Sequence, residues 1–297
     1  MDNTRSANVS RAEHAEHVNY NLKEYPAYIR KDFLSYYPNY SAISHWHGDL
    51  EFIVVLSGSI TFQVNGQNFL IESGNGIMVN SRQVHRGYSP EHRECEFICI
   101  LLHPLLLCVN DYFAKRYVNP IINNSSQPCL LLLQEIPWQK QVMDTLKAIY
   151  QCSIQNFDAL LIQQLAFSLW YSLYHNCPHA RGTPAKANRQ LITVKKMVTF
   201  IQEHYKETIT LDQIAASGNV CKSSCSSLFH KYLSRSPIAY LTEYRLDQSL
   251  ELLLHTDLSV TEISFETGFH NASYFAETFK KYYHCTPSGA AKQKWKN

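Results

Sequence analysis

The sequence predicts an α+β protein of two domains, with an N-terminal β-barrel that carries a helical hairpin and a C-terminal domain made only of helices. Three observations support this division. Short β-branched and aromatic runs alternate with turn residues over residues 41–103. Around Pro137 the spacing of apolar residues changes from two to nearly four, as expected where strands give way to helices. The chain of 297 residues is long enough for about two domains.

Residues 1–24 form a polar lead-in that lacks the apolar segment of a secretory signal, and we expect them to be flexible. The most apolar stretch, residues 98–109, is too short to span a membrane and is interrupted by His103 and Pro104. The nine cysteines show no paired spacing, so we expect reduced thiols. Together these features predict a cytoplasmic protein with no membrane partner.

Residues 25–135 are predicted to form the barrel. The runs LEFIVVLSG, SITFQV, QNFLIESG, IMVNS and ECEFICILL have the composition of strands. Asn65-Gly66 lies between two of these runs and tolerates the positive φ angles of a type I′ turn, so it predicts a hairpin. A small antiparallel barrel or sandwich is the expected result.

Residues 136–175 are predicted to form two helices, each with one apolar face at helical spacing. Either both faces pack on the barrel, or one of them remains free to form a dimer interface. The spacing of the apolar residues does not decide between these alternatives. The faces consist of Trp138, Val142, Leu146 and Ile149 in the first helix, and of Leu161, Leu165, Leu169 and Leu173 in the second.

Residues 176–189 contain prolines and a glycine and lack apolar periodicity, which predicts a linker between the domains. Charge is distributed unevenly along the chain. Residues 186–297 carry 14 Lys and Arg against 10 Asp and Glu, whereas the rest of the chain carries 13 against 15. This modest basic excess directs attention to residues 190–297 as the part that contacts nucleic acid.

Residues 190–297 contain an internal repeat, in which residues 211–233 and 260–283 each show a short helix, a tight turn and a longer helix. This is the helix-turn-helix arrangement, whose second helix enters the major groove of DNA. Asn219 and Gly268 occupy the turns, where a left-handed backbone is required. The helix predicted between the repeats, Pro237–His255, would space the two units about one turn of DNA apart. The apolar residues predicted to close the units are Ile209, Leu211, Ile214, Val220, Leu228 and Phe229 in the first, and Val260, Ile263, Phe269, Phe275 and Phe279 in the second.

The last hundred residues or so resemble the AraC/XylS family of transcription regulators. The resemblance rests on ISFETGFHNASYFAETFKKYYHCTPS and on the preceding IAASGNV and SSLFHKYLSRSPIAYLTEYRL. The chain departs from the family pattern at Ser234 and His284, where a glycine usually follows each recognition helix, and at Ala290-Ala291, where Tyr-Arg is usual. The resemblance implies a homodimer whose partners are double-stranded DNA, a small-molecule effector and RNA polymerase.

The same resemblance implies which side chains contact DNA. A serine side chain is short and can either donate or accept a hydrogen bond, so serine contacts should specify bases weakly. Glu277 could accept a hydrogen bond from the amino group of a cytosine, or it could belong to a network of surface side chains. Lys280 and Lys281 are candidate phosphate contacts. The positions that align with base contacts are Ser223, Ser226 and Ser227 in the first recognition helix, and Ala272, Ser273, Ala276 and Glu277 in the second.

The histidines of the N-terminal domain resemble the two sequence signatures of the cupin barrel. His45, His47 and Glu51 match the first signature and His85 matches the second. We expect His45 and His47 to point to one face of a strand, Glu51 to follow in the same phase, and His85 to come from a later strand. The chain departs from the signatures where Asn39 and Asn80 replace a glycine and a proline.

Three imidazoles and one carboxylate suit a divalent metal, so a metal-dependent cupin enzyme is the rival interpretation. Sensor cupins fused to AraC-type domains often keep this pattern for small-molecule binding. We therefore expect His45, His47, Glu51 and His85 to bind an effector without a metal or other cofactor. Trp46 and Phe52 could offer the effector stacking faces, although a buried aromatic residue in a barrel more often belongs to the core. The resemblance favours a carbohydrate or a derivative as the effector. It also favours an activator of transcription, with a repressor of the same architecture as the alternative.

Overall fold

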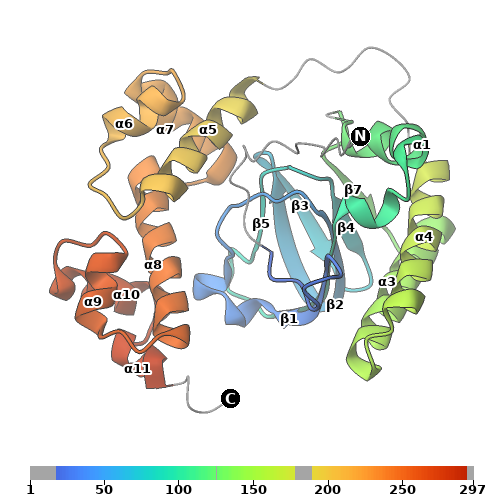
Figure 1. Cartoon of the computed structure of the whole chain (residues 1–297), viewed down its shortest axis with the longest axis horizontal. Coiled ribbons are helices and arrows are strands. Elements are labelled where there is room, and N and C mark those ends of the chain that lie inside the picture. The colour runs from blue at the N-terminus through green and yellow to red at the C-terminus, as the bar shows by residue number, and fades with distance from the viewer. Residues whose placement is uncertain (1–17, 125, 178–188, 293–297) are drawn as a thin grey trace, which may run out of the picture.

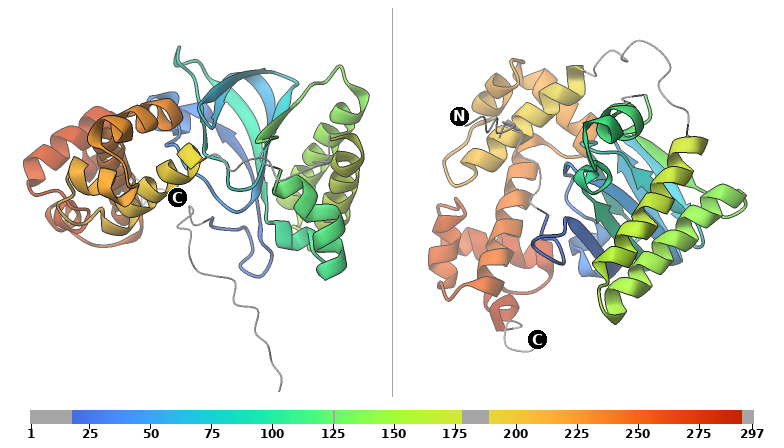
Figure 2. Two further views of the ribbon diagram at one scale, coloured as in Figure 1. Left: turned by 90° about the horizontal axis from the view of Figure 1, so that it is seen from above. Right: turned by 45° about the vertical axis from the view of Figure 1, so that its right-hand side comes forward.

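The computed structural model describes residues 18–124, 126–177 and 189–292. A β-rich domain lies in the centre, with helices α3 (Pro137–Gln155) and α4 (Ala159–Asn176) on one side and the C-terminal helices on the other (Figure 1). The two further views in Figure 2 show the same order of parts. No helix within these described ranges is long and apolar enough to cross a membrane.

The β-rich domain is built around β2 (Leu50–Val64), a strand of 15 residues. Its first half pairs with β4 and β6, and its second half pairs with β3 and β5, all antiparallel. The strand is therefore shared by two sheets, and the larger sheet has the order β1-β6-β2-β4-β7. This arrangement is compatible with the predicted cupin-like fold, although the larger sheet is open. The other strands are β1 (Ala27–Phe33), β3 (Gln67–Glu72), β4 (Gly76–Val79), β5 (His85–Tyr88), β6 (Cys95–Leu102) and β7 (Cys129–Leu132).

The sequence predicted two separate strands where the structure has the single strand β2. A bulge between Val55 and Ser57 bends the strand, so the chain passes from one sheet to the other without a turn. Gly58 has a φ of 75°, and a Cβ there would lie 2.2 Å from the backbone oxygen of Glu94, so only glycine permits this path. The predicted hairpin after β2 is confirmed, with φ angles of 49° at Asn65 and 85° at Gly66.

Both faces of the larger sheet are covered, which explains why the first half of β2, residues 50–56, is apolar except for Glu51. Phe52 and Val54 face the helical hairpin, whereas Ile53 and Val55 face the interior between the sheets. In α3 the predicted residues Val142, Leu146 and Ile149 are buried, and Trp138 is partly buried. In α4 the predicted residues Leu169 and Leu173 are buried, whereas Leu165 is only partly buried. Leu161 is 41 % exposed, and the buried residues of α4 are Ile162, Ala166, Leu169, Trp170 and Leu173.

The C-terminal helices confirm the predicted pair of helix-turn-helix units. Each unit begins with a capping box, formed by Thr210 in the first and Ser259 in the second. The turn residues have the predicted left-handed backbone, with φ angles of 54° at Asn219 and 82° at Gly268. The predicted apolar sets lie in two separate cores. The helices are α5 (Arg189–His204), α6 (Leu211–Ser217), α7 (Lys222–Leu233), α8 (Pro237–His255), α9 (Val260–Glu266), α10 (Ala272–Tyr283) and α11 (Pro287–Ala291).

Candidate functional site

A cavity of about 630 Å³ lies between the β-rich domain and the C-terminal helices. Apolar side chains from inside the β-rich domain form one part of the wall, among them Ile53, Phe62 and Phe97. Helices α8 and α10 form another part, with Tyr244 and Tyr282 among their contributions. A molecule that fills this cavity would therefore touch both domains. The volume is within the usual range for sites that bind small molecules.

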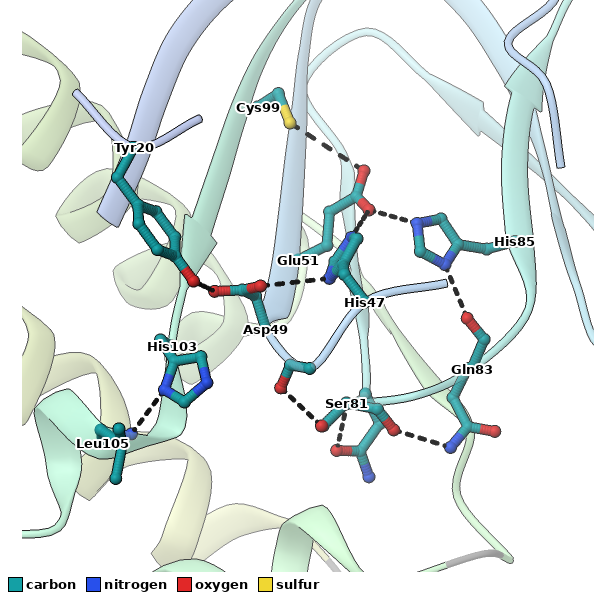
Figure 3. Close-up of polar contacts among 12 residues, drawn as sticks. Tyr20, His47, Asp49, Glu51, Ser81, Gln83, His85, Cys99, His103 and Leu105 are labelled. Carbon is teal, nitrogen blue, oxygen red and sulfur yellow. Dashed lines mark hydrogen bonds and ion pairs between the residues drawn. The ribbon is translucent and has the colours of Figure 1, made fainter. Parts of the chain in front are cut away.

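The structure brings the four predicted residues His45, His47, Glu51 and His85 together on the wall of this cavity. One side-chain atom from each of the four lies within 4.8 Å of the others. The Oε2 atom of Glu51 is 3.3 Å from His47 Nε2 and 2.5 Å from His85 Nε2. Both contacts are drawn as dashed lines in Figure 3. This cluster is the most concentrated group of ligand-type side chains in the cavity wall.

The elements that carry the cluster differ in part from the prediction. Glu51 lies on β2 and His85 is the first residue of β5, as expected. His45 and His47 lie in an extended segment before β2 and not on a strand, because the bridge from His45 to His85 is isolated and does not continue into a ladder. The extended backbone still alternates side chains, so the two imidazoles reach the same side.

The outer nitrogen of each imidazole faces an acceptor. His45 Nδ1 donates to the backbone oxygen of Ile43 and His85 Nδ1 to that of Gln83, both at 2.8 Å. His47 Nδ1 lies 3.7 Å from a carboxylate oxygen of Asp49. Because a carbonyl only accepts, Nδ1 carries a proton in both His45 and His85. The Nε2 atom of His85 faces the Glu51 carboxylate, so a proton lies between these two atoms, and a bound metal would take the place of that proton. Metal-binding histidines have this arrangement, so the four residues fit a divalent metal.

Glu51 is fully buried and yet ionised. Burial alone raises the pKa of a carboxyl group, but the neighbouring imidazoles of His85 and His47 outweigh burial and hold the pKa of Glu51 well below its usual range. The cavity therefore contains a fixed negative charge beside three imidazoles. This combination suits a ligand that donates hydrogen bonds, or a cation.

The remaining charged side chains on the cavity wall are also acidic. Asp247 and Glu251 of α8 are among the lining residues, and no Lys or Arg occurs among the described residues that line the cavity. The nearby Arg235 is outside the lining and pairs with Glu243 at 2.7 Å. An anionic ligand would therefore meet carboxylates without a compensating cation, which disfavours phosphates and carboxylic acids.

Sequence reasoning missed several residues of this site. Asp49 was detectable, because it continues the two-residue alternation of His45, His47 and Glu51. The tyrosines of α8 and α10 carried no such signal, because they reach the cavity only through the packing of one domain on the other. Trp46 does not line the cavity, and its side chain, 2 % exposed, packs in the apolar cluster of the C-terminal domain.

The two recognition helices α7 and α10 present their predicted contact residues on the surface. Ser223 and Ser227 are exposed in α7, as are Ser273 and Glu277 in α10. The predicted positions Ser226, Ala272 and Ala276 are partly buried, while Lys280 and Lys281 are exposed in the last turn of α10.

Cys221 is a reactive residue that the sequence did not identify. It caps the N-terminus of α7 and is exposed, with its Sγ 3.1 Å from the hydroxyl of Ser223 and 3.2 Å from that of Ser224. These hydrogen bonds stabilise the thiolate and lower the pKa of Cys221 to about 6. A thiolate therefore lies beside the predicted base-contact positions.

Comparison with known proteins gives matches to both parts of the chain. Residues 33–170 match the AraC-like ligand binding domain, and residues 214–293 match a helix-turn-helix domain. An uncharacterized HTH-type transcriptional regulator, YdeC of Bacillus subtilis, is 30 % identical over 82 % of this chain and 84 % of its own length. The melibiose operon regulatory protein of Escherichia coli is 23 % identical over 90 % of this chain and 89 % of its own. The crystal structure of ToxT from Vibrio cholerae covers 89 % of this chain and 98 % of its own, at 13 % identity and a TM-score of 0.48.

Proposed function

The chain belongs to the AraC family of transcription regulators, and from that premise we propose that a neutral carbohydrate or a derivative, bound in the cavity, controls how its two helix-turn-helix units engage DNA. The protein is a transcription regulator with a ligand-binding domain and a DNA-binding domain, and not an enzyme. The observation that carries the proposal is the cavity itself, whose wall combines the cluster of Glu51 and three histidines with residues of α8 and α10.

Three features of the wall support a carbohydrate. Tyrosine rings offer faces for stacking, and carboxylates and imidazoles offer acceptors for hydroxyl groups. The absence of Lys and Arg from the described lining disfavours sugar phosphates and fatty acids. A relative named for the melibiose operon regulates genes of a neutral disaccharide, which is consistent with the same ligand class here.

In this proposal Glu51 and the histidines hydrogen-bond the effector, without a metal. Activation of transcription, with RNA polymerase as the partner, is the regulatory outcome that we propose, and the protein acts in the cytoplasm where the chromosome is. Residues 25–135 form the sensor, residues 136–175 the hairpin, residues 176–189 the linker and residues 190–297 the DNA-binding domain. The base contacts and phosphate contacts are those named from the sequence, and the exposed outer side of α4 provides the surface for a homodimer.

The test measures DNA affinity of the full chain on a duplex selected from a random-sequence pool, in the presence of single compounds. The panel contains neutral mono- and disaccharides, including melibiose, together with sugar phosphates and a fatty acid. We expect a neutral sugar to change DNA affinity and Glu51→Gln to abolish that change. A response to the anionic compounds alone would refute the proposed ligand class.

A second arrangement, in which a divalent metal holds the effector, is favoured by one specific observation. The outer Nδ1 atoms of the histidines face acceptors while Nε2 atoms and the Glu51 carboxylate converge. A metal bound there would supply a Lewis-acidic position for a sugar hydroxyl. Elemental analysis of untagged protein separates the two arrangements. Direct effector binding predicts no stoichiometric metal, whereas near-stoichiometric metal that is lost in His47→Ala establishes the second arrangement.

A further inference from the structure

Residues 44–47, which precede β2 and are called here the coupling segment, alternate between two surroundings. His45 and His47 line the cavity. Trp46, between them, faces the opposite way and belongs to the same buried apolar cluster as residues of α5, α6 and α7. The alternation is that of any extended backbone, whose successive side chains point to opposite sides. One short segment thus contacts both the cavity and the first helix-turn-helix unit.

Trp46 is held in the C-terminal domain by packing. Its side chain is 2 % exposed, and Lys195 of α5 places its Nζ 5.7 Å from the ring centroid. The indole Nε1 is buried and has no hydrogen-bond partner among the residues that the structure describes. No directional bond therefore fixes the ring, and its position depends on the backbone that carries it.

Ser44 contacts the same unit from the same side of the segment. Its backbone oxygen accepts a hydrogen bond of 3.1 Å from the hydroxyl of Tyr240, which lies in the first turn of α8. Its own hydroxyl donates to the backbone oxygen of Leu233, at the end of α7, at 3.5 Å. Both contacts are buried, so the segment is attached where the first recognition helix ends and the long helix begins.

The second helix-turn-helix unit contacts the β-rich domain elsewhere. His284, which follows α10, has its Nε2 3.0 Å from the side-chain oxygen of Asn39, outside the coupling segment. A displacement of residues 44–47 therefore acts on the first unit and not directly on the second. Because both units must match successive faces of the DNA, a change in their relative position changes DNA affinity.

We propose that residues 44–47 transmit the state of the cavity to the first helix-turn-helix unit, with Trp46 as the positioning residue. A shift of the backbone at His45 and His47 carries Trp46 with it, and close-packed interiors do not absorb such a shift locally. Trp46 and Ser44 then displace α5 and the junction of α7 with α8. This inference rests on the proposed function, because it assumes that the cavity is the regulatory site.

A double-mutant cycle in the full chain tests the proposal without any effector. The DNA is the duplex selected from a random-sequence pool, and the variants are His47→Ala, Trp46→Phe and their combination. We expect His47→Ala to change the Kd for DNA at least about five-fold, and the change to fall below about two-fold in the Trp46→Phe background. The control is Phe97→Leu, which alters the cavity wall on β6, and its effect should be the same in both backgrounds. An equal effect of His47→Ala in both backgrounds, or no effect, would overturn the proposal.

A second measurement reports on Trp46 even where the Trp46→Phe variant folds poorly or the pool yields no preferred duplex. The protein is labelled with 5-fluorotryptophan, and the fluorine resonance of Trp46 is assigned by elimination, with the other tryptophans replaced one at a time by phenylalanine. We expect His47→Ala to shift that resonance and Phe97→Leu to leave it in place. A resonance unmoved by His47→Ala refutes the coupling. Failure to select any duplex refutes the proposed function instead, so the two failures are distinguishable.

Discussion

Replacing Gly268 with alanine tests how much the contacts around the turn of the second helix-turn-helix unit stabilise the C-terminal domain. Gly268 lies in the turn between α9 and α10 with a φ of 82°. A Cβ there would lie 2.3 Å from the backbone oxygen of Tyr205 and 2.9 Å from Nε of Arg245. The guanidinium of Arg245 bonds the backbone oxygens of Tyr205 and Glu207, each at 2.7 Å. The added methyl group therefore displaces the side chain that ties α8 to the segment following α5, beside the second unit.

The magnitude follows from two separate costs. A left-handed backbone costs an L-residue roughly 1–2 kcal/mol. Weakening the hydrogen bonds of a charged guanidinium costs about 1.5–3 kcal/mol. We therefore expect Gly268→Ala to lower the free energy of unfolding of the C-terminal domain by about 3 kcal/mol. The equivalent residue of the first unit is Asn219, with a φ of 54°, and Asn219→Ala should cost only the backbone part, about 1 kcal/mol.

Urea unfolding of both variants, followed by far-ultraviolet circular dichroism, measures this difference. With a slope of about 2 kcal/mol per molar urea, Gly268→Ala should move the midpoint of the C-terminal transition by roughly 1.5 M, and Asn219→Ala by about 0.5 M. Equal shifts for the two variants would show that the contacts around Arg245 contribute nothing, and would refute the reasoning.

Three further predictions concern the surface. Replacing Lys280 and Lys281 with alanine should weaken binding to selected and random duplexes alike and reduce the slope of log K against log salt by about 1.8, whereas an unchanged slope would exclude phosphate contacts. Because the pKa of Cys221 is lowered to about 6, its alkylation by iodoacetamide should rise through that pH and level off near neutrality; a rate still rising above pH 8 would contradict this. Leu160 is 81 % exposed on α4, so Leu160→Glu should convert a dimer to a monomer in light scattering without unfolding it. A dimer that survives the substitution excludes this surface.

The sequence alone was sufficient to predict the features that depend on residues close together in the chain. The turn residues Asn65, Asn219 and Gly268 each have the backbone that their position requires, and each marks its turn correctly. The two-residue alternation of His45, His47 and Glu51 placed these side chains together even though the first two are not on a strand. In each case neighbours in the chain carry the information.

Features that depend on the packing of distant segments could not be predicted. The continuity of β2 depends on the close approach of Gly58 to Glu94, which no local pattern encodes. The direction of Trp46 depends on the C-terminal domain packing against the segment from outside, so an aromatic residue beside two cavity histidines was assigned to the cavity. The same packing places Tyr244 in the cavity wall, far along the chain from the histidines.

The most direct test of the central claim is a hydroxyl-radical footprint of the full chain on a duplex that it has selected from a random-sequence pool. Two recognition helices joined by α8 predict, for each chain, two protected patches on one face of the DNA, with centres about one helical turn, roughly 10 base pairs, apart. Variants Ser227→Ala and Glu277→Ala should each alter one patch and leave the other. A single patch for each chain, or uniform protection without sequence preference, would contradict the account.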